Sequence, residues 1–152
     1  MSLSRWMLVL VLIPVVAAFS SPAIGEESSI LGAWKAESYD LKTGTSHALD
    51  GLIFFTGDDW ATLFFTLDAD KKPRRGSGEA GTYVLEGEHL TFSHQYQMSA
   101  GEELGSLPAE PLRMEIKHAD PTIEPCRFEI KGDEMVIFFP SGNQIRFSRS
   151  SR

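Results

Sequence analysis

The feature that most constrains this fold is a strict alternation of apolar and polar residues in the second half of the chain. From 90 to 98 the sequence reads Leu-Thr-Phe-Ser-His-Gln-Tyr-Gln-Met, and the same period of two recurs over 114–118 and 126–130. Such alternation predicts strands that place one face on a core and the other in water. A register slip of one residue would exchange the faces, so the pairing of these strands should be well specified.

Short runs of this kind, separated by turn signals, extend over most of the chain, and no helical period interrupts them. Evenly spaced strands with Gly-rich turns indicate a sandwich or a barrel. A charged loop is expected over 68–78. The segment 76–81 matches G-x-G-x-x-G in its letters, but no helix follows it, so we expect a flexible linker there. About nine strands are expected, over 32–41, 52–56, 60–67, 82–85, 90–98, 114–118, 126–130, 135–139 and 145–147.

The first 25 residues have the pattern of a secretory signal peptide. Arg5 is the single charged residue in this stretch, Met7–Phe19 is apolar, and small residues follow up to Gly25. An uncleaved membrane anchor is the alternative, but it needs about 20 apolar residues. The pattern therefore predicts cleavage after Ala23 or Gly25 and export to the periplasm or exterior of a bacterium, with no stable membrane anchor afterwards.

The remaining segment, 26–152, has the length of one domain. Removing Arg5 leaves 13 of the 14 Lys and Arg residues against 21 Asp and Glu residues. An acidic surface repels phosphate backbones, so a nucleic-acid partner is not expected. Cys126 is the single cysteine, which excludes an internal disulfide and favours a buried apolar role. The histidines lack the spacing of a zinc site, and we expect no metal, no cofactor and a monomer.

Three motifs together resemble those of the bacterial lipocalin-like domains, which are relatives of the lipocalins in the calycin group. They are Leu31-Gly32-Ala33-Trp34-Lys35, the hairpin Gly81–Thr91 of the form G-T-Y-x-x-x-G-x-x-L-T, and the closing pair Phe128–Met135 with Ile145–Phe147. The resemblance implies an all-β fold, a small antiparallel up-and-down β-barrel of about eight to ten strands over 26–152.

The resemblance also implies a plug at one end of the barrel. The Trp of the first strand closes that end in the family, and a basic residue of the last strand often packs on it. Trp34 is then the plug beside Gly32, with Arg146 or Arg149 as its partner. Parity does not decide between the two arginines, and Arg146 is the working choice. A guanidinium over an indole face stabilises by about 0.5–2 kcal/mol.

Candidate ligand-binding residues follow from the inward parity of the strands. His94 and Tyr96 lie two residues apart on an apolar face, where they would orient an apolar guest. The alternative is that both lie at the barrel mouth, bonded to water or loop backbone. His118 shares the apolar parity of another strand. The other expected interior residues are Phe65, Phe92, Met114 and Phe128.

Three functions are compatible with these features. The leading hypothesis is a non-catalytic barrel that binds a small hydrophobic or amphipathic molecule, because a barrel of this size holds at most one small ligand. The second is an isomerase- or cyclase-type enzyme with His94 as acid or base and Tyr96 as donor. The third is a structural envelope protein with a filled barrel, which would show an exposed apolar patch.

Overall fold

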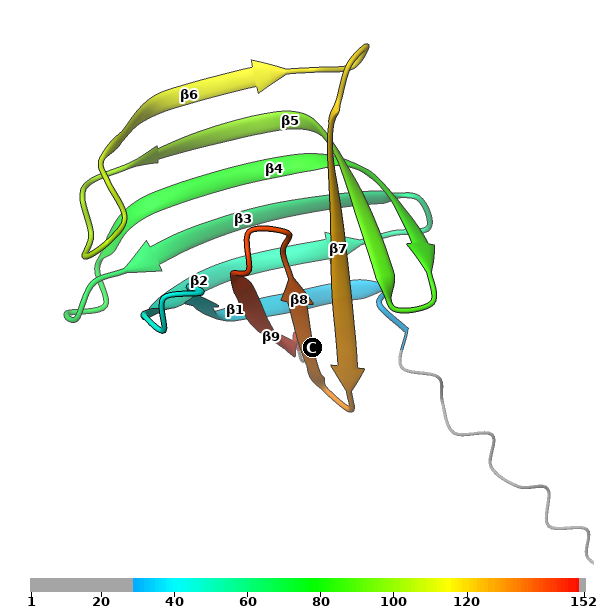
Figure 1. Ribbon diagram of the computed structural model, residues 1–152, viewed down its shortest axis with the longest axis horizontal. Coiled ribbons are helices and arrows are strands. Elements are labelled where there is room, and N and C mark those ends of the chain that lie inside the picture. The colour runs from blue at the N-terminus through cyan, green and yellow to red at the C-terminus, as the bar shows by residue number, and fades with distance from the viewer. Residues whose placement is uncertain (1–28, 151–152) are drawn as a thin grey trace, which may run out of the picture.

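The computed structural model describes residues 29–150, and this part of the chain is entirely strands and connections (Figure 1). The expected signal peptide, 1–25, lies outside the described residues. Within 29–150 no helix is long and apolar enough to cross a membrane. The nine strands found there are β1 (Gly32–Asp40), β2 (Ser46–Phe55), β3 (Asp59–Leu67), β4 (Pro73–Glu86), β5 (His89–Gly101), β6 (Glu110–Ile116), β7 (Thr122–Lys131), β8 (Glu134–Phe138) and β9 (Gln144–Arg149).

Eight of these strands close into a barrel. β1 to β5 pair in sequence order, β5 pairs with β7, β7 with β8 and β8 with β9, and β9 returns to β1. Every pairing is antiparallel, and β6 stands outside the ring beside β5 (Figure 1). The expectation of an all-β, up-and-down barrel is confirmed, and the fold is lipocalin-like.

β5 has two partners along one edge. Its first half, His89–His94, pairs with β7, and its second half, Tyr96–Gly101, pairs with β6. β6 and β7 therefore run in the same direction along β5, separated by residues 117–121. At that break the chain turns, so β7 descends across the open side of the barrel while β6 continues the sheet outward (Figure 1).

A β-bulge at Gln95 bends β5 at this branch point. Gly81 of β4 lies opposite His94 and Ala80 lies opposite Tyr96, which leaves Gln95 as the extra residue. Gly81 permits the close approach, because an added Cβ would lie 1.8 Å from the carbonyl oxygen of Ser93. A bulge also reverses the side-chain alternation of a strand. Phe92 is buried before the bulge, whereas Tyr96 is exposed after it.

The segment expected to be a charged loop and a Gly-rich linker is instead the first half of β4. This prediction was wrong from Pro73 onward, because β3 and β5 pair with β4 on both sides. The neighbouring strands supply the packing that glycine lacks. At Gly76, for example, the ring of Phe65 lies where a side chain would be, 3.3 Å from an added Cβ.

Trp34 lies buried near one end of the barrel, at the start of β1. Its side chain is fully buried, and its indole Nε1 donates a hydrogen bond to the Ile30 carbonyl at 2.8 Å. Arg149 lies opposite Trp34 in the β1–β9 pairing, with its guanidinium 4.0 Å from the indole ring centroid. The same guanidinium donates to the carbonyls of Ser29 and Leu31. Gly32 begins β1 with φ +108°, a conformation that favours glycine.

Arg146 is not the partner of Trp34, so the working choice was wrong. Arg146 projects outward and donates to Asp40 Oδ2 at 2.9 Å. The reason is simple alternation, because Ile145 and Phe147 are buried and Arg149 shares their inward parity. Alternation in the sequence did not decide between the arginines, because a bulge near the end of β9 would have exchanged their faces. The bulge lies instead in β1, between Ala36 and Ser38, and β9 runs regularly.

Replacing Gly81 tests the branch point. We expect Gly81→Ala to lower the free energy of unfolding by at least about 2 kcal/mol, because the new methyl overlaps the Ser93 carbonyl. Gly78→Ala, in the same strand, is the matched control, since its Cβ would meet neighbours at ordinary contact distances of 3.7 Å or more. Urea unfolding measures both. Equal losses in the two variants would contradict the close-approach argument.

The two arginines give a second test. Arg149→Ala should cost about 1–3 kcal/mol, because it removes a cation–π contact and two hydrogen bonds to backbone carbonyls. Arg146→Ala removes an exposed ion pair and should cost about 0.5 kcal/mol or less. Thermal or urea unfolding decides the order, and a larger loss at Arg146 would overturn the assignment of Arg149.

Candidate functional site

The barrel contains a cavity of about 700 Å³ on the side away from Trp34. Trp34 lies at the start of β1, where β9 ends. The cavity reaches the opposite end of these strands, marked by Tyr39 near the end of β1 and Pro140 after β8. Much of its wall is apolar. The large apolar side chains of this wall include Leu49, Ile53, Trp60, Phe64, Phe92, Leu107, Ile137, Phe139, Ile145 and Phe147.

One side of the cavity carries a charged cluster of three side chains. His94 of β5 lies between two carboxylates, with Nδ1 2.6 Å from Glu79 Oε2 and Nε2 3.2 Å from Glu124 Oε2. Glu79 comes from β4 and Glu124 from β7, the two strands that flank the first half of β5. The cluster therefore forms where the barrel closes.

The two carboxylates hold His94 in its protonated form. Burial alone would lower the pKa of the imidazole, but its hydrogen bonds to Glu124 and Glu79 and their negative charges outweigh burial and raise the pKa to about 9. The imidazolium donates one N–H to each carboxylate. At neutral pH the cluster therefore carries two negative charges and one positive charge, and His94 has no lone pair with which to accept a proton.

Trp60 presents an unused hydrogen-bond donor in the same region. Its ring packs edge-on against His94, with centroids 5.0 Å apart, and its side chain lines the cavity. The indole Nε1 is buried and has no acceptor among residues 29–150. A buried N–H without a partner is costly, by about 1–3 kcal/mol. Trp60 therefore contributes its ring, and not its N–H, to the surface of the cavity.

The connection between β5 and β6 covers part of the mouth. Arg75 at the start of β4 holds it, donating from Nη1 to the carbonyls of Glu102 and Pro108 at 2.8 and 2.6 Å. The same guanidinium pairs with Glu110, whose other oxygen accepts from Ser99. Leu107, in this connection, lines the cavity. The rim charge of Arg75 is thus neutralised within the fold.

The structure brings two of the seven predicted interior residues to the cavity, Phe92 and His94. Phe128 points inward but packs in the core outside the cavity lining. Tyr96 lies on the outer surface, where its ring contacts His118 at a centroid distance of 4.9 Å. These placements differ from expectation because the bulge turns Tyr96 outward. Phe65 and Met114 are also exposed, Phe65 on the outside of β3 and Met114 on β6, which stands outside the ring.

Three residues of the site were not predicted. Glu124 lies two residues before the buried Cys126 in β7, so the alternation of that strand already indicated that Glu124 points inward. Glu79 lies in the Gly-rich segment that was expected to be a linker, and Trp60 lies in a strand with apolar residues on both parities. The thiol of Cys126 is buried, and desolvation raises its pKa to about 12, so it stays protonated and unreactive.

Comparison with known proteins gives one structural match at low sequence identity. A solved structure of a lipocalin-like protein from Bacteroides uniformis ATCC 8492, at 1.79 Å resolution, aligns with a TM-score of 0.47 and 13% sequence identity. The match covers 79% of this chain and 97% of that chain. No protein-family model matches the sequence, and no curated protein matches it. The lipocalin-like fold rests on the strand order and closure described above.

The charged cluster predicts a pH-dependent stability. Because the pKa of His94 is about 9 in the folded protein and near 6.5 when exposed, its stabilisation is complete below pH 6.5 and is lost as pH rises through 9. We expect wild-type protein to lose on the order of 2 kcal/mol between pH 6.5 and 9.5 beyond the loss in His94→Gln. Urea unfolding at several pH values measures this. His89→Gln, at an exposed histidine, is the control and should keep the wild-type slope.

Proposed function

We propose that this protein is an exported lipocalin-like barrel that binds one small amphipathic molecule without chemically changing it. The observation that carries the proposal is the cavity of about 700 Å³, with a largely apolar wall and one charged side. Ligand sites of small molecules typically enclose about 300–1,000 Å³ and combine apolar walls with a few polar groups. Export is proposed from the signal-peptide pattern of residues 1–25.

The cavity supports a carrier rather than a filled structural barrel. The aromatic residues do not close the interior, because Phe54 and Phe65 lie on the outer surface. Phe92 and Phe147 pack along the wall and leave the space beside them open. An apolar body of a guest would replace water there and gain about 25 cal/mol for each Å² of apolar surface that it buries.

The charged cluster restricts the polar end of the guest. Glu79, Glu124 and the His94 imidazolium carry a net charge of −1, and Arg75 is paired with Glu110 at the rim. A ligand carboxylate would face this excess negative charge in a region of low dielectric. A hydroxyl group suits the site, since it donates to a carboxylate. A protonated amine also suits it, because it balances the charge.

Catalysis is less well supported than binding. The enzyme hypothesis paired His94 with Tyr96, and these side chains lie on opposite faces of the barrel wall. The raised pKa of His94 also leaves it protonated at neutral pH, so it is poorly matched to a general base. Three other polar groups of the cavity, Arg75, Ser99 and Glu110, bind each other.

A displacement experiment tests ligand binding and its charge preference together. The neutral fluorophore N-phenyl-1-naphthylamine serves as the probe, and 1-dodecanol, dodecylamine and dodecanoate serve as competitors of equal chain length. We expect the alcohol and the amine to displace the probe at least about tenfold more strongly than the carboxylate, because of the net charge of −1 beside the cavity. Glu124→Gln should reduce this discrimination, and Glu86→Gln, at the exposed end of β4, should not.

A second pair of variants tests whether the fluorescent probe binds inside the cavity. Ser77→Trp puts a bulky ring into the cavity from β4 and should abolish probe binding, whereas Val84→Trp adds the same ring on the outer face of β4 and should leave it unchanged. Probe binding that survives Ser77→Trp, or a preference for dodecanoate, would contradict the proposed site.

A further inference from the structure

We propose that β6 is a self-association edge, through which two copies of this chain pair antiparallel about a two-fold axis centred on Met114. This inference is independent of the ligand site, because β6 lies outside the closed barrel. It replaces the expectation of a monomer. Three features of the strand carry it: an unpaired backbone edge, an exposed apolar row, and charges that complement themselves.

The unpaired edge is the first feature. β6 pairs with β5 on one side, and within residues 29–150 no strand occupies its other side. The Lys117 amide donates to the Gln95 carbonyl at 2.7 Å, so the backbone groups of odd-numbered residues point toward β5. The N–H and C=O groups of Leu112, Met114 and Ile116 therefore point to the free edge, where another strand can pair with them.

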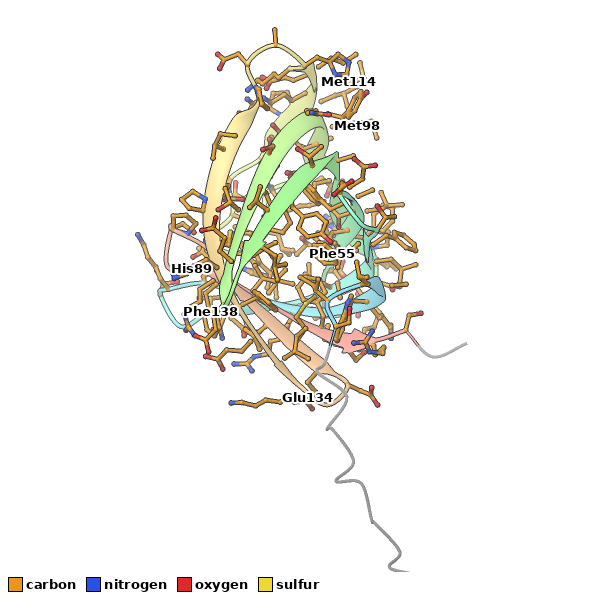
Figure 2. The ribbon with its side chains drawn as sticks, turned by 90° about the vertical axis from the view of Figure 1, so that its right-hand side faces the viewer. Phe55, His89, Met98, Met114, Glu134 and Phe138 are labelled. Carbon is orange, nitrogen blue, oxygen red and sulfur yellow. The ribbon has the colours of Figure 1, made fainter. Side chains whose placement is uncertain are left out.

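The exposed apolar row is the second feature. Leu112, Met114 and Ile116 are 62%, 70% and 71% exposed. They continue an apolar surface, because Met98 lies opposite Met114 and Tyr96 opposite Ile116 in the β5–β6 pairing. Figure 2 shows Met98 and Met114 together at one end of the molecule, far from Glu134. A contiguous apolar face of this kind on a soluble domain marks an interaction surface.

The charge pattern is the third feature, and it selects the partner. In an antiparallel pairing centred on Met114, Arg113 of one copy lies opposite Glu115 of the other, and the contact occurs twice by symmetry. Leu112 lies opposite Ile116 of the second copy, and the two Met114 side chains meet. Within one chain Glu115 already binds Arg113 and Lys117, at 2.7 and 2.8 Å, and pairing adds to each Glu115 a contact with Arg113 of the second copy.

Neighbouring registers are less favourable for definite reasons. A two-fold axis at Arg113 or at Glu115 sets identical charges directly opposite each other. It also aligns residues whose backbone groups are used by β5. An axis at Ile116 lies at the end of the strand, so few residues pair. An axis at Leu112 sets Arg113 opposite Pro111 and Met114 opposite Glu110, so no opposite charges meet. β6 therefore favours one register in which it complements itself. Binding to a lipid surface or to an unrelated protein would not require such self-complementarity, so the pattern points to a second copy of this chain.

Sedimentation equilibrium of the purified protein tests the dimer. We expect a mass twice that of the chain, and Arg113→Glu should raise the dimer dissociation constant at least about tenfold, because two attractive pairs become repulsive. The double variant Arg113→Glu/Glu115→Arg restores opposite charges and should restore association. A monomer over the whole concentration range would overturn the proposal, and binding of the protein to phosphatidylglycerol vesicles would not rescue it. A dimer whose dissociation constant is unchanged by Arg113→Glu would also overturn the proposal.

Cysteine cross-linking tests the register. Met114→Cys should form an intermolecular disulfide, because directly opposite Cα atoms in a hydrogen-bonded pair lie about 5.5 Å apart, within the range of the bond. Met98→Cys is the matched control and should not cross-link, since two such residues would be about 14 Å apart across three strand spacings. The native Cys126 is buried. Cross-linking at Met98 but not at Met114 would overturn the proposed axis.

Discussion

The close approach of Gly81 to the Ser93 carbonyl is the constraint on which the rest of this barrel depends. Only a residue without a Cβ fits there, because the added atom would lie 1.8 Å from that oxygen. The approach accommodates the extra residue Gln95 in β5, and the strand bends. The bend divides β5 into a half that closes the barrel through β7 and a half that carries β6 beyond it.

The same bulge sets the two chemical surfaces of the molecule. Before it, His94 faces the cavity and meets Glu79 and Glu124 from the flanking strands. After it, Tyr96 and Met98 face outward and join the apolar side of β6. One backbone irregularity in β5 therefore separates a charged cluster inside the barrel from an apolar face outside it.

Alternation predicted the cavity residues only as far as it remained unbroken. Phe92 and His94 follow the period up to the bulge and were placed correctly, and Tyr96 follows the same period in sequence but not in space. Glu79 was hidden because glycines on both sides of it suggested a linker. Cross-strand packing, such as Phe65 over Gly76, turns that segment into a strand, and no local pattern records such a partner.

The sequence by itself determined the class of the fold and its number of strands, because period and turn residues are local signals. The plug role of Trp34 came from the resemblance of the Gly-x-Trp motif to the lipocalin-like domains. Tertiary structure decided which arginine covers Trp34, where β5 changes face, and that two carboxylates meet one histidine. Those outcomes depend on register between strands far apart in the chain. Register is set by bulges and close approaches, which become defined only when the barrel closes.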